Sequence, residues 1–291
     1  MDSLPPAGDK QAAAYDRHPA GEAAVTLPAI SAAFTADTAK AIAEAPEEPG
    51  NLTKLTLAPL GSPPRSCPEV MPAWWRLRRT HDSVTGLFET LILVRRKRAE
   101  ANQGGTRGRL HNDAQDVLRA AIVFTSAGVD AAIQALIHEA VPLLIKQPAG
   151  TPRLKYETFV EQQARAPEVE KDFIQALTAQ DPRAEILALY IASKTKASFQ
   201  GHTDLRDRAG GALGITNEQI PKSRFDALKT FFIARNDVAH QLDMEDITQS
   251  RTKPVRKSVR AQQDVRKMCD QALLVVRDMI HKTATNLTNC R

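Results

Sequence analysis

The chain has 291 residues, of which 25% are charged and 42% hydrophobic, values that are ordinary for a soluble protein. Aromatic residues make up only 5%, and the abundance of alanine, leucine and isoleucine favours helices over a sheet core. The three cysteines, Cys67, Cys269 and Cys290, form no CxxC pair, which argues against a disulfide framework or a zinc site and indicates a reducing compartment.

The net charge of +5 is unevenly distributed. Residues 1–50 contain more acidic than basic residues, whereas basic clusters occur at 76–79, 95–98 and 251–267. A basic patch indicates an anionic partner such as nucleic acid, and a solvated helix surface is the alternative for each cluster. No apolar run approaches the roughly 20 residues of a membrane span, and the N-terminus lacks the basic start and apolar stretch of a signal peptide. We therefore expect a cytoplasmic protein that does not enter a membrane.

Residues 1–72 are predicted to form a disordered or weakly structured extension. Alanine, proline, glycine, threonine and glutamate dominate it, and several prolines between residues 59 and 72 would interrupt any regular element. Met71 lies just before the first clear helical pattern. Two interpretations therefore stay open: a functional N-terminal arm, or a start site placed too early.

Two long helices are expected next, over 74–101 and from 113 to about 140. In the second, apolar residues leave little polar surface, which predicts the buried centre of a bundle. Gly128 and the alanines around it should allow neighbouring helices to approach closely. Pro142 should kink or restart this helix.

Shorter helices follow, at roughly 154–164, 168–179 and 182–199, with another turn or two over 203–213. Asp181-Pro182 is a strong helix-start signal because it places a capping side chain before a first-turn proline. Pro221 opens a further helix, and the last helix spans about 258–284. No segment shows strand alternation. The sequence therefore predicts an all-α domain over residues 73–287, built as a bundle of about four to six helices.

The segment Arg235-Asn236-Asp237-Val238-Ala239-His240 carries the groups that phosphodiester chemistry needs. An arginine binds anionic oxygens, and a histidine can give or take a proton near neutral pH. Spacing alone is weak evidence, since Arg76 and His81 also match it. That second pair lies within an amphipathic helix and was assigned to a solvated face.

The helical position of Arg235 distinguishes the first pair. If the helix that carries Phe231 continues, Arg235 falls within about 30° of the centre of its apolar face, where an unpaired guanidinium is costly. The helix must then end near Ala234, or Arg235 must face a cavity, an anion or another subunit. Asn236 would share a helical edge with His240. The alternative is that Arg235 pairs with Asp237 or Asp243 and His240 is a surface residue.

The motif Arg235-Asn236-x3-His240, one helix before the C-terminal helix, resembles the signature of HEPN-domain ribonucleases. The central segment from Leu118 to Ile133 is similar to the long Ser-Ala-x-x-Asp helix of the RiboL-PSP-HEPN branch, with Ser126 and Asp130 at the matching positions. The resemblance covers roughly residues 74–285. From the residues alone, Ser126 and Asp130 are interpreted as hydrogen-bonded core polarity rather than catalysts.

The resemblance implies a HEPN-like bundle and a metal-independent endoribonuclease without a cofactor. The RNA 2′-OH would attack the adjacent phosphate and leave a 2′,3′-cyclic phosphate. His240 would transfer protons, Arg235 would bind the non-bridging oxygens, and Asn236 would bind the phosphate or orient the His240 ring. In HEPN proteins, two chains place their motifs on either side of a shared cleft. The resemblance therefore implies a homodimer with a composite site.

The basic segment after the motif is expected either to follow the RNA backbone or to form a solvated linker; its candidate RNA-binding residues are Lys253, Arg256, Lys257 and Arg260. The resemblance suggests a toxin or antiphage effector that has an antitoxin or regulatory partner. Two alternatives stay open: a non-catalytic HEPN module that binds a nucleotide or a protein, and an unrelated helical DNA-binding protein. The sequence has no phosphate-binding loop, nucleophile elbow or acidic metal cluster.

Overall fold

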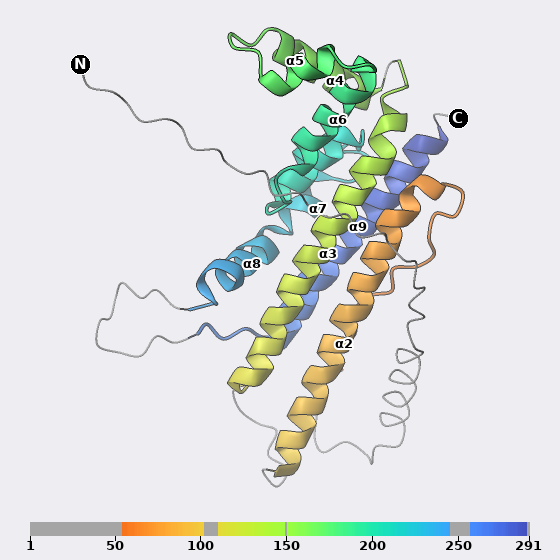
Figure 1. The fold of residues 1–291 in the computed structure, drawn as a ribbon. Helices are drawn as coiled ribbons and strands as arrows, with labels where there is room; N and C mark the ends of the chain where they lie inside the picture. The colour runs from red at the N-terminus through yellow and green to blue at the C-terminus, as the bar shows by residue number, and fades with distance from the viewer. Residues whose placement is uncertain (1–53, 102–109, 149, 245–256, 290–291) are drawn as a thin grey trace, which may run out of the picture. The chain divides into compact units, whose positions relative to one another are not determined.

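The computed structural model describes residues 54–101, 110–148, 150–244 and 257–289, all within a compact unit that begins at Pro49. These residues form eight α-helices and no strand (Figure 1). A single isolated bridge joins Met244 to Lys257. The predicted all-α class is confirmed, while the number of helices exceeds the expected four to six.

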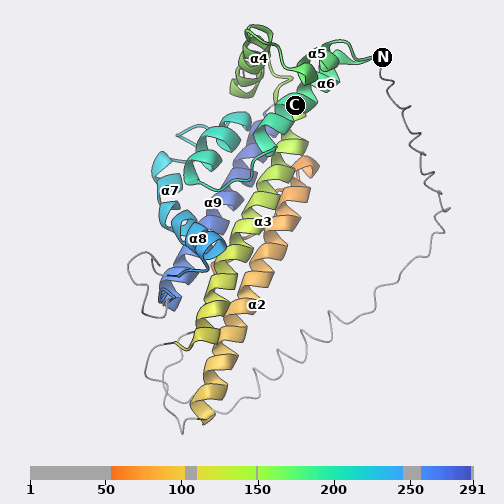
Figure 2. The ribbon, with the colours of Figure 1, turned by 60° about the vertical axis from the view of Figure 1, so that its left-hand side comes forward.

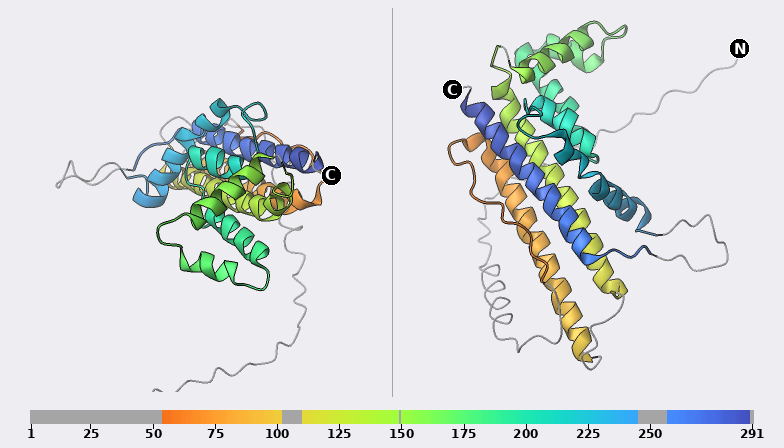
Figure 3. Two further views of the ribbon diagram at one scale, coloured as in Figure 1. Left: turned by 90° about the horizontal axis from the view of Figure 1, so that it is seen from above. Right: turned by 180° about the vertical axis from the view of Figure 1, so that it is seen from behind.

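Three long helices lie side by side through the length of the described unit: α2 (Met71–Ala101), α3 (Asn112–Leu144) and α9 (Gln262–Thr288) (Figures 1 and 3). Helix α3 packs against both of the others and buries sixteen of its residues. This confirms the prediction of a buried central helix. Pro142 lies in its last turn and neither restarts nor ends it.

The contact between α2 and α3 depends on Gly128. A Cβ atom at this position would lie 1.9 Å from Thr80 Oγ1 and 2.5 Å from Thr80 Cβ, far inside van der Waals contact. Glycine is therefore the residue that allows the two backbones to approach at this level, as the sequence predicts.

Helix α3 is long and apolar enough to cross a membrane by length and composition, and just over half of its most apolar window is buried inside the protein. The expectation that no segment reaches this threshold was wrong, because small residues such as alanine raise the hydropathy without forming a continuous run of large apolar side chains. The central helix of a bundle passes the same test, so this property alone does not favour a membrane span.

The segment before α2 packs onto the bundle, which corrects the predicted domain boundary at residue 72. Its backbone is fixed by Ala58, whose N–H donates to Asp270 Oδ1 (2.8 Å) and whose carbonyl lies 3.1 Å from His81 Nε2. The described domain therefore begins before Ala73; residues 1–53 lie outside the described part. The side chains of this segment that enter the core are Leu55, Leu57, Leu60, Cys67 and, in the short helix η1 (Pro68–Val70), Val70.

Shorter helices cover the remaining side of α3 (Figure 2). Helices α4 (Thr151–Ala164), α5 (Lys171–Leu177) and α6 (Pro182–Thr195) share a small second core around Phe173. Asp181 accepts a hydrogen bond from the N–H of Ala184 at 3.1 Å, so the predicted helix start is confirmed. The π-helical turn η2 (Asp204–Gly210) follows.

The helix expected after Pro221 is two helices, α7 (Lys222–Asp226) and α8 (Lys229–Gln241). They are separated at Ala227 and Leu228, the second of which is buried. The last helix begins at Gln262, later than the expected residue 258. The residues just before it have their backbone groups bonded to other segments, as described below.

Candidate functional site

Helix α8 carries the Arg–His motif and is held against the core by its apolar face. Phe231, Phe232, Ala234 and Val238 are buried. The helix continues through the motif to Gln241, so it does not end near Ala234. It is terminated by Leu242 (φ 50°) and Asp243 (φ 59°), two non-glycine residues in a left-handed conformation that ordinarily costs roughly 1–2 kcal/mol each.

Arg235 lies partly buried at the edge of this apolar face. Its Nη1 donates to Oδ1 of the adjacent Asn236 at 3.0 Å. Within the described part of the chain, no carboxylate pairs with its guanidinium. The two acidic residues considered as partners, Asp237 and Asp243, both pair with Arg260 instead. The alternative in which Arg235 is neutralised by a neighbouring aspartate is therefore not observed.

His240 is exposed near the end of α8, and its ring makes no hydrogen bond or ion pair with any residue the structure describes. At 100° per residue, the backbone positions of Arg235 and His240 are about 140° apart around the helix axis. The position of Asn236 lies between them, about 40° from that of His240. Because Arg235 bends toward Asn236, the three polar groups follow one side of α8. The structure brings Arg235 and Asn236 into contact and leaves His240 one turn away.

A network of charged side chains, here named the ionic clasp, fixes the end of α8; Arg119 and Asp243 are its buried members. It consists of Asp116, Arg119, Asp243, Lys257 and Arg260. Asp243 is 2% exposed and accepts from Arg119 Nε (3.0 Å) and Arg260 Nε (2.8 Å), with a further contact to Arg260 Nη2. Asp116 pairs with Arg119 Nη1 (2.8 Å) and Lys257 Nζ (3.1 Å). The clasp joins the beginning of α3, the end of α8 and the residues that precede α9.

Backbone groups extend the clasp. Arg119 Nη2 donates to the carbonyl of Ser258 at 2.7 Å, and the Ser258 N–H donates to the carbonyl of Asp243 at 2.7 Å. Gln115 exchanges two hydrogen bonds with the backbone of Arg260, at 3.0 and 2.9 Å. The two ends of the segment 245–256 are therefore held together beside α3.

The charges of the clasp also act on Asp116. Partial burial raises the pKa of this carboxyl, but hydrogen bonds from Lys257 and Arg119 outweigh it, so the net pKa lies below its ordinary value. The carboxylate is thus stabilised in its charged form. Asp243, by contrast, is almost fully buried, and two arginines, Arg119 and Arg260, compensate its charge in the interior.

The four residues predicted to bind RNA divide into two groups. Lys253 and Arg256 lie outside the described residues. Lys257 and Arg260 belong to the clasp, where both are paired with carboxylates. Their role in RNA binding stays a prediction, but the guanidinium of Arg260 is already engaged by the protein.

Sequence reasoning did not identify the clasp. Arg119 and Asp243 are 124 residues apart, and no periodic pattern links them. The only available signal was Arg119 itself, a cation at a position that the helical pattern of α3 would place among buried residues.

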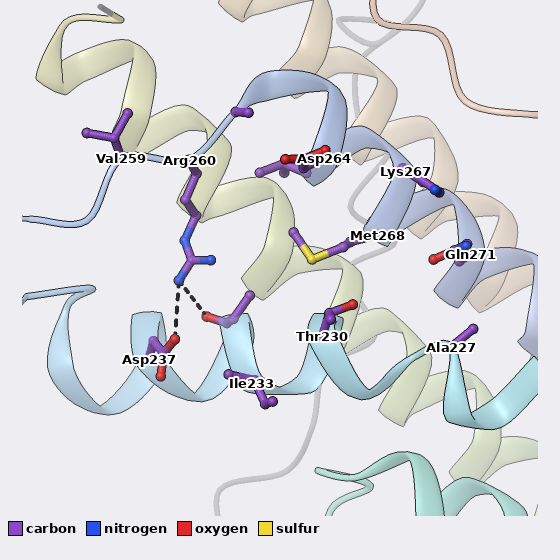
Figure 4. Close-up of a pocket in the computed structure, with 13 residues that line it drawn as sticks. Ala227, Thr230, Ile233, Asp237, Val259, Arg260, Asp264, Lys267, Met268 and Gln271 are labelled. Atoms are coloured by element: carbon purple, nitrogen blue, oxygen red, sulfur yellow. Dashed lines mark hydrogen bonds and ion pairs between the residues drawn. The ribbon is translucent and has the colours of Figure 1, made fainter.

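An open groove lies beside the motif, between α8 and the first turns of α9 (Figure 4). Its volume is about 630 Å³. Arg260 crosses one end, within 3.5 Å of Asp237 Oδ2 and of the Ala234 carbonyl oxygen. The wall from α8 includes Thr230, Ile233 and Asp237; the opposite wall includes Val259, Asp264, Lys267, Met268 and Gln271.

Other candidates from the sequence have structural roles. His81 bonds the Ala58 carbonyl, so it does not lie on a solvated face as expected, while Arg76 is exposed. Asp130 accepts from the N–H of Phe199 (2.7 Å) and from Gln134 (2.9 Å), as expected for core polarity. Among the described residues, no group of three histidine, cysteine or acidic side chains could hold a metal ion.

No family model, curated protein or solved structure matches this chain.

Proposed function

We propose that the protein is a metal-independent endoribonuclease of the HEPN type. The observation that carries this proposal is that Arg235 has no carboxylate partner among the described residues. Asp237 and Asp243 are close in sequence, but both pair with Arg260. An unpaired cation at the edge of an apolar face favours binding of an anion, and a phosphate is the anion that the motif implies.

The three motif residues have complementary roles in this proposal. Arg235 binds the non-bridging oxygens of the scissile phosphate and stabilises the charge that develops in the transition state. Asn236 orients the Arg235 guanidinium, as its 3.0 Å hydrogen bond indicates. His240, which is exposed and has no partner among the described residues, transfers a proton to or from the reacting oxygens, and such proton transfer contributes typically 10²–10⁴-fold to the rate.

A homodimer with a composite site is part of the proposal. Cyclisation requires both a base for the 2′-OH and an acid for the leaving 5′-oxygen, and each chain offers one histidine in the motif. Arg235 and His240 of one chain point about 140° apart at their backbone positions. A second motif facing the first would supply the missing proton carrier and a second guanidinium. A toxin or antiphage role, with an antitoxin or regulatory partner, would follow from such an activity.

The test is cleavage of single-stranded RNA in the presence of a chelator. The wild-type protein should produce 2′,3′-cyclic phosphate ends, and Arg235→Ala or His240→Ala should each lower the rate at least 100-fold. Arg76→Ala and His138→Ala are matched controls, because both residues are exposed and lie outside α8; they should retain full activity.

Mixing wild-type protein with increasing amounts of His240→Ala protein tests the composite site. If one cleft needs the histidines of both chains, mixed dimers are inactive, so the cleavage rate should fall with the square of the wild-type fraction. A fall in simple proportion to the wild-type fraction, with mixed dimers demonstrated, would contradict the composite site. Absence of cleavage by the wild-type dimer would instead favour a non-catalytic binding module.

A further inference from the structure

The groove between α8 and α9 lies on the side of α8 that adjoins His240. Measured around the helix from Arg235, Asn236 lies at about 100°, His240 at about 140°, Ile233 at about 160° and Asp237 at about 200°. Around the helix axis, His240 lies between the Arg235–Asn236 contact and the groove wall; along the axis, it lies about one turn beyond Arg235, towards the end of α8. A strand whose phosphate is held at Arg235 and Asn236 would have His240 beside that phosphate and could reach the groove with its next nucleotide.

Apolar side chains in the groove are unusually exposed for this protein. Ile233 and Val259 are each 51% exposed, and they lie on opposite walls together with the partly buried Met268. Apolar side chains of this kind can pack against the face of a nucleobase, which buries apolar area on both sides. The volume of about 630 Å³ lies within the range of small-ligand sites.

Polar groups in the groove are not used by the fold. The side chains of Asp264, Lys267 and Gln271 line it, and none of them makes a hydrogen bond or ion pair with another residue in the described ranges. The Asp264 carboxylate can only accept hydrogen bonds when ionised. It therefore favours the exocyclic amino groups of adenine, cytosine and guanine over the single N3–H of uracil, which lies between two carbonyl oxygens that repel a carboxylate. Lys267 supplies a cation for a neighbouring phosphate.

We infer that this groove binds one single-stranded RNA nucleotide beside the phosphate cleaved at His240, and that Asp264 makes it favour bases with an exocyclic amino group over uracil. The inference rests on the proposed function for its substrate class. It adds a binding site and a base preference that the catalytic motif does not provide, and it assigns a role to the exposed apolar walls.

The experiment measures RNA affinity without cleavage. His240→Ala protein is titrated against fluorescently labelled octamers of adenylate, cytidylate and uridylate, and fluorescence anisotropy gives each Kd. The adenylate and cytidylate octamers should bind several-fold more tightly than the uridylate octamer. Adding Ile233→Ser should weaken adenylate binding several-fold, because apolar surface that the base would bury is lost. Adding Asp264→Asn should remove the preference against uridylate.

Leu154→Ser is the matched control, because Leu154 is similarly exposed (57%) and lies on α4; it should change neither affinity nor preference. Equal binding of all octamers by every variant would overturn the groove assignment. So would an absence of RNA binding, which would leave the groove to a protein partner. Because binding is measured in a cleavage-deficient protein, failure of the ribonuclease activity is detected separately with the wild type.

Discussion

Asp243 is the residue on which the site most depends, although it is not part of the motif. It follows His240 by three positions, adopts a left-handed conformation, and places a nearly buried carboxylate between two arginines. This arrangement ends α8 directly after the histidine. The position of the His240 ring is therefore determined partly by residues on α3 and before α9.

Replacing Asp243 should show how much the clasp contributes to the free energy of unfolding. Asp243→Ala leaves Arg119 and Arg260 without their shared partner, and loss of one member of a buried ion pair costs roughly 3–5 kcal/mol. Asp113→Ala removes an exposed pair with Arg98 (2.6 Å) and should cost less than about 1 kcal/mol. Urea unfolding of both variants measures the difference. Equal destabilisation would contradict the buried character of the clasp.

His281 should make stability depend on pH. Burial lowers the pKa of its imidazole below the ordinary 6.5, with a further contribution from Arg277, and the ring packs edge-on against Trp74 (centroids 5.5 Å apart). As pH falls through 6.5, the unfolded chain takes up this proton before the folded one, so stability decreases until the folded pKa is reached. His281→Gln should reduce the fall in Tm between pH 7 and pH 5.5, whereas the exposed His138→Gln should not.

At the scale of helices, the close packing of α2 against α3 depends on a glycine, Gly128, which has no side chain. Gly128→Ala would place a methyl group within 2.5 Å of Thr80 Cβ, so the helices must separate, at an expected cost of about 1–3 kcal/mol. Gly86→Ala, on α2 with nothing within 4 Å, should instead stabilise by about 0.5–1 kcal/mol. Thermal unfolding of the two variants should move Tm in opposite directions.

The helices themselves were largely predictable, because 3.6-residue periodicity, Gly128 and the Asp181-Pro182 signal are local in sequence. The break between α7 and α8 was missed because the apolar positions of Phe225, Leu228 and Phe231 keep helical spacing across it. Within the candidate site, the apolar side of α8 on which Arg235 lies could be predicted from the helix alone, although the partly buried Arg235 lies nearer the edge of that face than the predicted centre. The partners of Asp237 and Asp243 could not, since Arg260 and Arg119 reach them from distant segments.

For the whole molecule, the segment before α2 decides where a stable chain can begin. A chain starting at Met71 would lose Leu55, Leu57 and Leu60, all at most 5% exposed, and each buried leucine contributes about 1.5–3 kcal/mol. That loss is comparable to the entire stability of a typical domain. We expect this truncation to aggregate or to melt without a cooperative transition, and a chain starting at Pro49 to unfold cooperatively. Circular dichroism melts distinguish the two.

The clasp also determines how well the fold should tolerate insertions between α8 and α9. Met244 and Lys257 are bridged, and Ser258 is bonded to Asp243, so the described residues on either side of positions 245–256 are bonded directly to one another. Lengthening the chain between two fixed points costs only about 0.6 kcal/mol per doubling of its length. We therefore expect a tag or binding peptide inserted between Met244 and Lys257 to leave α8 and α9 in place.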